Sequence, residues 1–133
     1  MGNVRLTVRI DFGADRALGP GKIRLLEAIG KTGSISRGGR ALGMSYRRAW
    51  LLVDDMNRCF RAPVVATQPG GVRGGGAALT PFGLELIGKY RAIEARATAT
   101  AKRHLQALEN SLRQRRARAQ KSLKTSIRAA TAR

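Results

Sequence analysis

Two stretches with helical patterns meet at Gly43, and this junction constrains the fold more than any other feature of the chain. Each stretch, residues 35–42 and residues 46–60, directly follows a serine. These serines, Ser34 and Ser45, suit the N-cap position of a helix. A glycine can adopt the left-handed conformation that ends one helix and turns the chain into the next. Two short helices joined in this way predict a helix-turn-helix.

The apolar residues of these two stretches predict which faces are buried. In the second stretch the apolar positions have the i, i+3, i+4, i+7 spacing of a buried stripe, and they are Ala49, Leu52, Val53, Met56 and Phe60. In the first stretch the positions expected to face inward are Ile35, Gly39 and Leu42. Trp50 adjoins the stripe, and a tryptophan in the middle of a helix is usually well buried. We therefore expect Trp50 in the core, with a DNA contact as the alternative.

The remaining segments complete the order strand, helix, helix-turn-helix, two-stranded wing and long helix. Apolar and polar residues alternate from position 4 to position 12, which is typical of a half-buried strand. Thr80 and Pro81 suit the first positions of a helix. The expected segments are a strand over 4–12, a turn over 13–19, a helix over 22–31 preceded by Pro20, strands over 64–67 and 77–79 around a glycine-rich loop over 70–76, and a helix over 81–112. This order predicts the α+β class, with a winged helix-turn-helix and a long C-terminal helix.

Charge narrows the choice of partner. The formal net charge is +18, from 26 Lys and Arg residues against 8 Asp and Glu residues. Residues 101–133 alone hold 10 basic residues and 1 acidic residue. Charge of this size repels itself, so a polyanionic partner is the simplest reason for it. Double-stranded DNA is the leading candidate; RNA or the ribosome stays open, and an anionic membrane surface is the weaker choice.

The sequence offers little for catalysis or metal binding. Cys59 is the single cysteine and His104 the single histidine, which excludes an internal disulfide, a zinc cluster and a Cys/His pair. The sequence shows no paired carboxylates, no nucleophile with its base and no nucleotide-binding loop. We therefore expect that the protein is not an enzyme and that it has no cofactor, no metal site and no catalytic residue. There is no membrane-span-length apolar run and no signal peptide, so we expect a cytoplasmic, nucleoid-associated protein without a membrane partner.

The turn after Gly43 carries the residues expected to read DNA. A recognition helix enters the major groove with its N-terminal turn, which here holds Tyr46, Arg47 and Arg48. The arginines can bind guanine or phosphate, and the tyrosine can stack or donate its hydroxyl group. The full set expected at the DNA is Ser34, Ser36, Arg37, Ser45, Tyr46, Arg47, Arg48, Gln68 and Arg73.

The other members of this set have supporting roles. Ser34, Ser36 and Arg37 begin the first helix of the motif, whose free amides can accept a phosphate. Arg73 lies at the tip of the wing, where it can enter the minor groove or bind phosphate. Plainer interpretations stay open: the serines act first as helix caps, the arginines are solvated charges, and residues 70–76 are an ordinary hairpin tip.

We expect three parts: a winged helix-turn-helix DNA-binding domain over residues 1–80, a dimerisation helix over 81–112 and a basic, disordered tail over 113–133. The apolar stripe of the long helix outlasts the small domain that it leaves, and an unmatched stripe predicts a homodimer. The tail can be a solvated segment, a non-specific DNA contact or a docking segment for another protein; its charge favours the DNA contact.

Several segments, taken together, match a known family. They are residues 25–29 (LLEAI), 33–36 (GSIS), 43–50 (GMSYRRAW), 56–57 (MN), 70–80 (GGVRGGGAALT), 83 and 86–87. In this combination the chain resembles, over about residues 4–95, the N-terminal domain of ModE-type molybdate-responsive regulators. The resemblance implies a LysR-like winged helix-turn-helix that binds palindromic operator DNA as a homodimer. Family members that sense molybdate carry oxyanion-binding domains after this region, whereas a basic, alanine-rich segment follows here, so we expect no molybdate binding by this chain.

Two functions compete on this basis. The first is a sequence-specific transcriptional regulator in which Tyr46 and Arg47 read bases while Arg37 and Arg73 hold the backbone. The alternative is a nucleoid-associated architectural protein that binds DNA through charge with little sequence specificity. The basic tail is the feature that favours the alternative.

Overall fold

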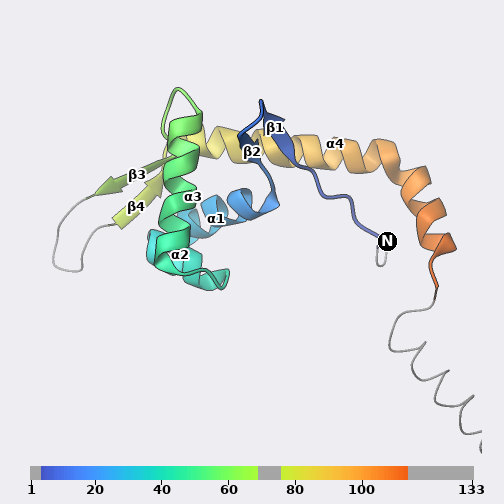
Figure 1. Ribbon diagram of the computed structural model, residues 1–133, viewed down its shortest axis with the longest axis horizontal. Coiled ribbons are helices and arrows are strands. Elements are labelled where there is room, and N and C mark those ends of the chain that lie inside the picture. The colour runs from blue at the N-terminus through green and yellow to red at the C-terminus, as the bar shows by residue number, and fades with distance from the viewer. Residues whose placement is uncertain (1–3, 69–75, 114–133) are drawn as a thin grey trace, which may run out of the picture. The chain divides into compact units, whose positions relative to one another are not determined.

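The computed structural model describes residues 4–68 and 76–113 of the chain (Figure 1). The elements are, in order, β1 (Ile10–Phe12), β2 (Arg16–Leu18), α1 (Pro20–Thr32), α2 (Ile35–Ala41), α3 (Tyr46–Cys59), β3 (Val65–Gln68), β4 (Gly76–Leu79) and α4 (Pro81–Ser111). The chain divides into two compact units, residues 6–99 and residues 1–5 with 100–133. The first unit holds the helix-turn-helix and both hairpins. The predicted α+β class with a winged helix-turn-helix is confirmed.

The helix-turn-helix forms as its sequence predicts. Gly43 lies between α2 and α3 with a φ of 73°, in the left-handed region that favours glycine. The hydroxyl of Ser34 accepts a hydrogen bond from the backbone N–H of Arg37 at 3.1 Å. The hydroxyl of Ser45 accepts one from the backbone N–H of Arg48, also at 3.1 Å. Both serines are therefore N-caps that satisfy free amides in the first turn of a helix.

The two helices of the motif cross closely because Gly39 has no side chain. A Cβ atom on Gly39 would stand 2.6 Å from the Cβ of Ala49. Ile35 and Gly39 are buried as expected, but Leu42 is 38% exposed, so its expected burial is wrong. The reason is that α2 ends at Ala41: Leu42 has a φ of −105° and a ψ of 11°, and the helical period no longer sets the direction of its side chain.

The N-terminal region is a short hairpin instead of one long strand. β1 pairs with β2 in antiparallel fashion, with Ile10 opposite Leu18. The strand expected over residues 4–12 is thus reduced to its last part, and the turn expected over 13–19 contains a second strand. Leu18 is 2% exposed. Burial of this apolar side chain in the core is favourable, and it holds residues 16–18 where they can pair with β1.

One apolar core joins α1, α2, α3 and the start of α4 to both hairpins. Its buried members include Leu18, Ile23, Leu25, Leu26, Ile29, Ile35, Ala49, Val53, Met56, Val64, Val65, Ala77, Leu86 and Tyr90. In the stripe expected on α3, Ala49, Val53 and Met56 are buried, whereas Leu52 and Phe60 are half-buried beside the core. The core therefore fixes the inner face of α3 and leaves its outer face to the solvent.

The wing is attached to α3 at its base. β3 pairs with β4 in antiparallel fashion, with Val65 opposite Leu79. The side-chain amide of Asn57, on α3, accepts a hydrogen bond from the N–H of Val64 at 2.7 Å and donates one to the carbonyl of Val65 at 3.2 Å. The two strands expected around the glycine-rich loop are confirmed within one residue at each end. Asn57 thereby holds the wing at a fixed position beside α3.

The helix α4 begins where its sequence predicts. The hydroxyl of Thr80 accepts a hydrogen bond from the N–H of Gly83 at 2.9 Å and donates one to the carbonyl of Pro63 at 2.6 Å. Leu86 and Tyr90 enter the core, but other large apolar side chains of the expected stripe are exposed: Ile93, Leu108 and Leu112. Among residues 4–68 and 76–113, none of the helices could span a lipid bilayer.

Candidate nucleic-acid interface

The first turn of α3 projects from the surface of the first unit. Tyr46 is 58% exposed, and Arg47 and Arg48 are exposed beside it. Further along the same helix, Ala49 and Val53 are buried in the core. Because the core holds the inner face, the N-terminal turn of α3 stays accessible to a ligand, as a recognition helix requires.

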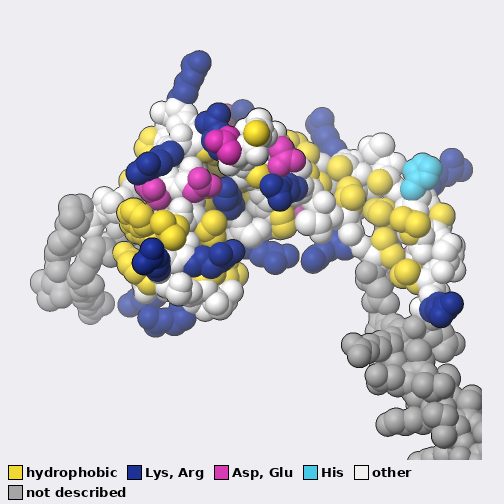
Figure 2. All heavy atoms as spheres, in the orientation of Figure 1, with side chains coloured by type: hydrophobic (Ala, Val, Ile, Leu, Met, Phe, Trp, Pro, Cys, Tyr) yellow, Lys and Arg dark blue, Asp and Glu magenta, His cyan; other side chains and the backbone are white. Residues whose placement is uncertain are grey.

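The surface around this turn lacks acidic residues. Residues 28–53 contain no Asp or Glu, and their basic residues are Lys31, Arg37, Arg40, Arg47 and Arg48. Within the described residues none of these side chains makes an ion pair. In Figure 2 the acidic side chains gather over the β1–β2 hairpin and the C-terminal part of α3, while basic and hydrophobic side chains cover α2 and the start of α3. This uncompensated positive charge favours an anionic partner.

Acidic residues elsewhere on the same unit do pair with basic ones. Arg91, on α4, lies 2.7 Å from a carboxylate oxygen of Glu27 and 2.8 Å from one of Glu94. The hydrogen bonds from Arg91 to these two carboxylates raise the pKa of Arg91 above its usual value. Lys22 likewise lies 2.6 Å from a carboxylate oxygen of Asp55 and ties α1 to α3. These charged side chains form ion pairs with one another inside the unit, so they are less available to a partner.

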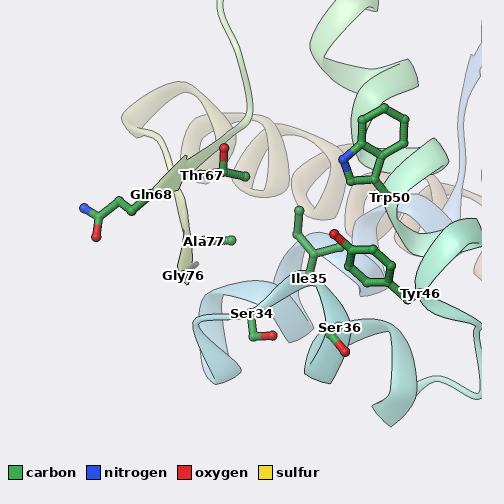
Figure 3. Close-up of a pocket in the computed structure, with 9 residues that line it drawn as sticks. All are labelled: Ser34, Ile35, Ser36, Tyr46, Trp50, Thr67, Gln68, Gly76 and Ala77. Carbon is green, nitrogen blue, oxygen red and sulfur yellow. The ribbon is translucent and has the colours of Figure 1, made fainter. Parts of the chain in front are cut away.

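A hollow of about 270 Å³ separates α3 from the wing (Figure 3). Its lining comes from the start of α2, from α3 and from the wing strands: Ser34, Ile35, Ser36, Tyr46, Trp50, Thr67, Gln68, Gly76 and Ala77. In Figure 3 the Tyr46 hydroxyl and the Trp50 indole nitrogen face the hollow, while the Gln68 amide points away from the helices. The lining contains hydroxyl, amide and aromatic groups and no charged side chain.

Trp50 is exposed, so its expected place in the core is wrong. The residue is 45% exposed although its neighbour in sequence, Ala49, is fully buried. Successive residues of an α-helix point about 100° apart, so burial of one does not bury the next. Tyr46 lies one turn before Trp50 on the same side of the helix, the side that faces the hollow.

The structure brings several of the predicted DNA-contacting residues together. At the hollow lie Ser34, Ser36, Tyr46 and Gln68. Outside its lining, on α2 and at the start of α3, the exposed members are Arg37, Ser45, Arg47 and Arg48. Arg73 lies outside the described residues, as does nearly all of the predicted basic tail. As contacts to DNA, all nine residues stay predictions.

Known proteins resemble part of this chain in sequence. The chain is 54% identical over 78 residues to the molybdenum-pterin-binding protein MopB of Rhodobacter capsulatus, a match that covers 59% of this chain and 29% of MopB. It is 41% identical over 90 residues to the molybdenum transport protein ModE of Azotobacter vinelandii, covering 68% of this chain and 33% of that protein. Over part of its length the chain is thus similar in sequence to MopB and ModE. The DNA-binding transcriptional dual regulator ModE of Escherichia coli (strain K12) is a further relative, 42% identical over 71 residues that cover 53% of this chain and 27% of that protein.

The expected ModE resemblance is thus confirmed, within limits. The chain spans 27–33% of the length of these three curated relatives. No family model matches the chain. Among solved structures, a point mutant of the S. aureus protein MepR has a TM-score of 0.49 and 13% identity over a match that covers 86% of this chain and 80% of that one. A structural similarity at this level supports no conclusion about this chain.

Sequence reasoning missed Trp50 and the wing residues Thr67 and Ala77 as parts of the candidate site. For Trp50 a signal was present, because its spacing of four from the exposed Tyr46 places both side chains on one side of a helix. For Thr67 and Ala77 no local signal exists, since their place in the hollow depends on how the wing packs beside α3.

Proposed function

We propose that this chain is a sequence-specific DNA-binding transcriptional regulator. The observation that carries the proposal is the acid-free surface around the first turn of α3, where exposed arginines lie at the start of a recognition helix. The core holds the rest of the helix in place, so this turn is preorganised for the major groove. The names of the ModE relatives, one of which is a DNA-binding transcriptional dual regulator, support the same function.

In the proposed complex α3 lies in the major groove. Arg47 binds the O6 and N7 atoms of a guanine, and Tyr46 stacks or donates its hydroxyl group near by. Arg37 and Arg73 bind phosphates on either side, and these contacts set the position of the protein without reading sequence. Arg48, which lies outside the lining of the hollow, takes a base or a phosphate.

We further propose that two copies of the chain bind a palindromic operator. α4 carries exposed leucine and isoleucine side chains, which are Leu84, Ile93 and Leu108. Exposed apolar side chains on a long helix favour pairing with a second copy, and a two-fold symmetric dimer matches a palindromic half-site arrangement. Light scattering of the purified chain is expected to give the mass of two copies, 14.4 kDa each.

The test is selection of binding sites from a random DNA pool with the full chain, followed by competition with unselected DNA at physiological salt. A sequence-specific regulator is expected to enrich a palindrome and to bind it at least about 1,000-fold more tightly than unselected DNA. Absence of an enriched sequence would contradict the proposal and favour the architectural alternative. The basic segment 101–133 is the feature that supports this alternative.

Removal of residues 113–133 separates the two functions further. The deletion removes eight Lys and Arg residues, so we expect weaker binding to every DNA and a smaller salt dependence, while the preferred sequence stays the same. If the deletion instead abolished the sequence preference, the recognition role of α3 would be wrong.

We also propose that the protein is cytoplasmic and nucleoid-associated, that it catalyses no reaction and that this chain does not bind molybdate. Calorimetric titration of the purified chain with molybdate tests the last of these proposals.

A further inference from the structure

We propose that the hollow between α3 and the wing holds one deoxyribose-phosphate unit of a DNA strand, and that Trp50 donates its indole N–H to the phosphodiester. The inference rests on the proposed function and deepens it, because it names the chemical group that this part of the surface binds. It also gives a role to a side chain that sequence reasoning places in the core.

The groups that line the hollow can donate hydrogen bonds. The side chains of Ser36, Tyr46, Trp50 and Thr67 bear O–H or N–H groups that make no hydrogen bond within the described part of the chain. The hydroxyl oxygen of Ser34 accepts from the N–H of Arg37, which leaves its own O–H free to donate. A cluster of neutral donors without a carboxylate suits an acceptor-only group such as a phosphodiester.

The size of the hollow favours a small part of a polymer. Pockets for whole small-molecule ligands span roughly 300–1,000 Å³ and enclose most of the ligand. At about 270 Å³, the hollow lies below that range. One sugar with its phosphate needs less space, and the rest of the strand can continue outside.

The charge around the hollow distinguishes a strand from a free anion. No charged side chain lines it, so a free doubly charged oxyanion would lack a counter-charge there. A phosphodiester carries a single negative charge, and the exposed Arg37, which directly follows the lining residue Ser36, can share it. The aromatic rings of Tyr46 and Trp50 supply apolar surface against which a deoxyribose can pack.

The position between helix and wing agrees with this occupant. A helix in the major groove and a wing at the adjacent minor groove are separated by one sugar-phosphate backbone. The hollow lies between those two elements of this chain, and Asn57 fixes the base of the wing beside α3.

Trp50 provides its own reporter, because it is the single tryptophan of the chain. We expect a duplex enriched from a random pool by the full chain to shift the tryptophan emission to shorter wavelength and to reduce quenching by acrylamide. Binding of the same duplex is followed independently by the anisotropy of a label on the DNA. Binding without any change at Trp50 would overturn the inference and leave the proposed function intact.

A double-mutant cycle between protein and DNA then locates the contact. Trp50→Phe keeps an aromatic ring but removes the N–H, and we expect about tenfold weaker binding, since a hydrogen bond to a charged group is lost. Methylphosphonate placed at each position of the duplex in turn removes the charge of one phosphate. At the contacted phosphate we expect the two changes to be non-additive, so that Trp50→Phe weakens binding to that probe by less than about twofold.

The matched control is Arg58→Ala, on the same helix, where the side chain is 79% exposed and paired with Asp54. It is expected to combine additively with every methylphosphonate. Additivity of Trp50→Phe at every position would overturn the inference. Saturable quenching of Trp50 by inorganic phosphate or molybdate at micromolar concentration would also overturn it, in favour of a small-anion site. Failure of the proposed function has a different signature: no enriched sequence at all.

Discussion

Arg47 and Arg91 lie on two helices of the same unit and have opposite surroundings. Arg91 donates hydrogen bonds to Glu27 and to Glu94, within a network that joins α1 to α4. Arg47 is exposed on a surface where residues 28–53 provide no carboxylate, and it makes no ion pair within the described residues. The same side-chain chemistry therefore stabilises the fold in one place and stays available in the other.

The contrast shows that the positions of the few acidic residues tell more about function than the net charge does. A paired, partly exposed arginine contributes only a modest amount to stability. An unpaired arginine contributes little to the fold, but it can neutralise a phosphate or bind a guanine and release counterions. The +18 charge is thus divided into structural charges and charges left for a partner.

The largest effect is expected from Arg47→Ala. Loss of a bidentate guanine contact is expected to cost about 1–3 kcal/mol, or about 5- to 150-fold in affinity for an enriched duplex, with relaxed preference at one base pair. The melting temperature is expected to stay unchanged, because the side chain makes no bond within the described fold. Anisotropy titrations on single-base variants of the duplex measure both affinity and preference.

Arg58→Ala is again the matched control, because it removes one positive charge from the same helix. An equal loss of affinity in the two variants would show that charge alone matters and that α3 reads no base through Arg47. In that case the comparison between free and paired arginines would have no bearing on specificity.

A smaller effect is expected from Tyr90→Phe, next to Arg91 in the paired region. Tyr90 is 1% exposed, and its hydroxyl donates a 2.6 Å hydrogen bond to the carbonyl of Val8. Loss of this bond is expected to lower the free energy of unfolding at neutral pH by about 1 kcal/mol. Urea denaturation monitored by circular dichroism measures the difference.

The same variant gives a pH dependence. Burial is the main cause that raises the pKa of Tyr90 above its ordinary value, and the negative charge of Glu94 is the second. A raised pKa means that the folded state holds the phenolic proton more tightly than the unfolded chain. The contribution is therefore fully present below the unfolded pKa of about 10 and is lost as the pH rises through the higher folded value. We expect the stability gap between the wild type and Tyr90→Phe to close above about pH 10. A constant gap would contradict this, and Tyr46→Phe, at an exposed tyrosine, is the control.

Much of the fold follows from local sequence signals. The caps Ser34 and Ser45, the left-handed turn at Gly43 and the start of α4 at Pro81 are all set by residues within one helical turn, and all are confirmed. The β1–β2 hairpin differs, because pairing of residues 16–18 depends on burial of Leu18 against distant core residues. Local patterns cannot predict such long-range packing.

The candidate site is predictable only along α2 and α3. The exposure of Arg47 follows from the register of the apolar stripe on α3. Tyr46 lies three residues before the buried Ala49, near the stripe, and is exposed because it is the first residue of the helix. Trp50 is misplaced by sequence reasoning because proximity in sequence to the buried Ala49 does not mean proximity in space. The wing side of the hollow, including Thr67, arises from tertiary contacts such as those of Asn57 with the base of the wing, which no sequence pattern specifies.

The smallest effect is expected from Arg91→Ala, which tests the comparison from its structural side. The Arg91 side chain is 37% exposed and pairs with carboxylates that are also partly exposed, so water screens the network. We expect its removal to lower the free energy of unfolding by roughly 0.2–1 kcal/mol. Arg91→Lys keeps the charge but loses the forked geometry, and it is expected to recover only part of the stability. In both variants the affinity of the folded protein for an enriched duplex is expected to stay within about twofold of the wild type, since the guanidinium already has its partners. Arg91→Ala could instead weaken DNA binding as much as Arg47→Ala does. Pairing with Glu27 and Glu94 would then not show that an arginine serves only the fold, and the distinction between paired arginines and arginines available to DNA would be wrong.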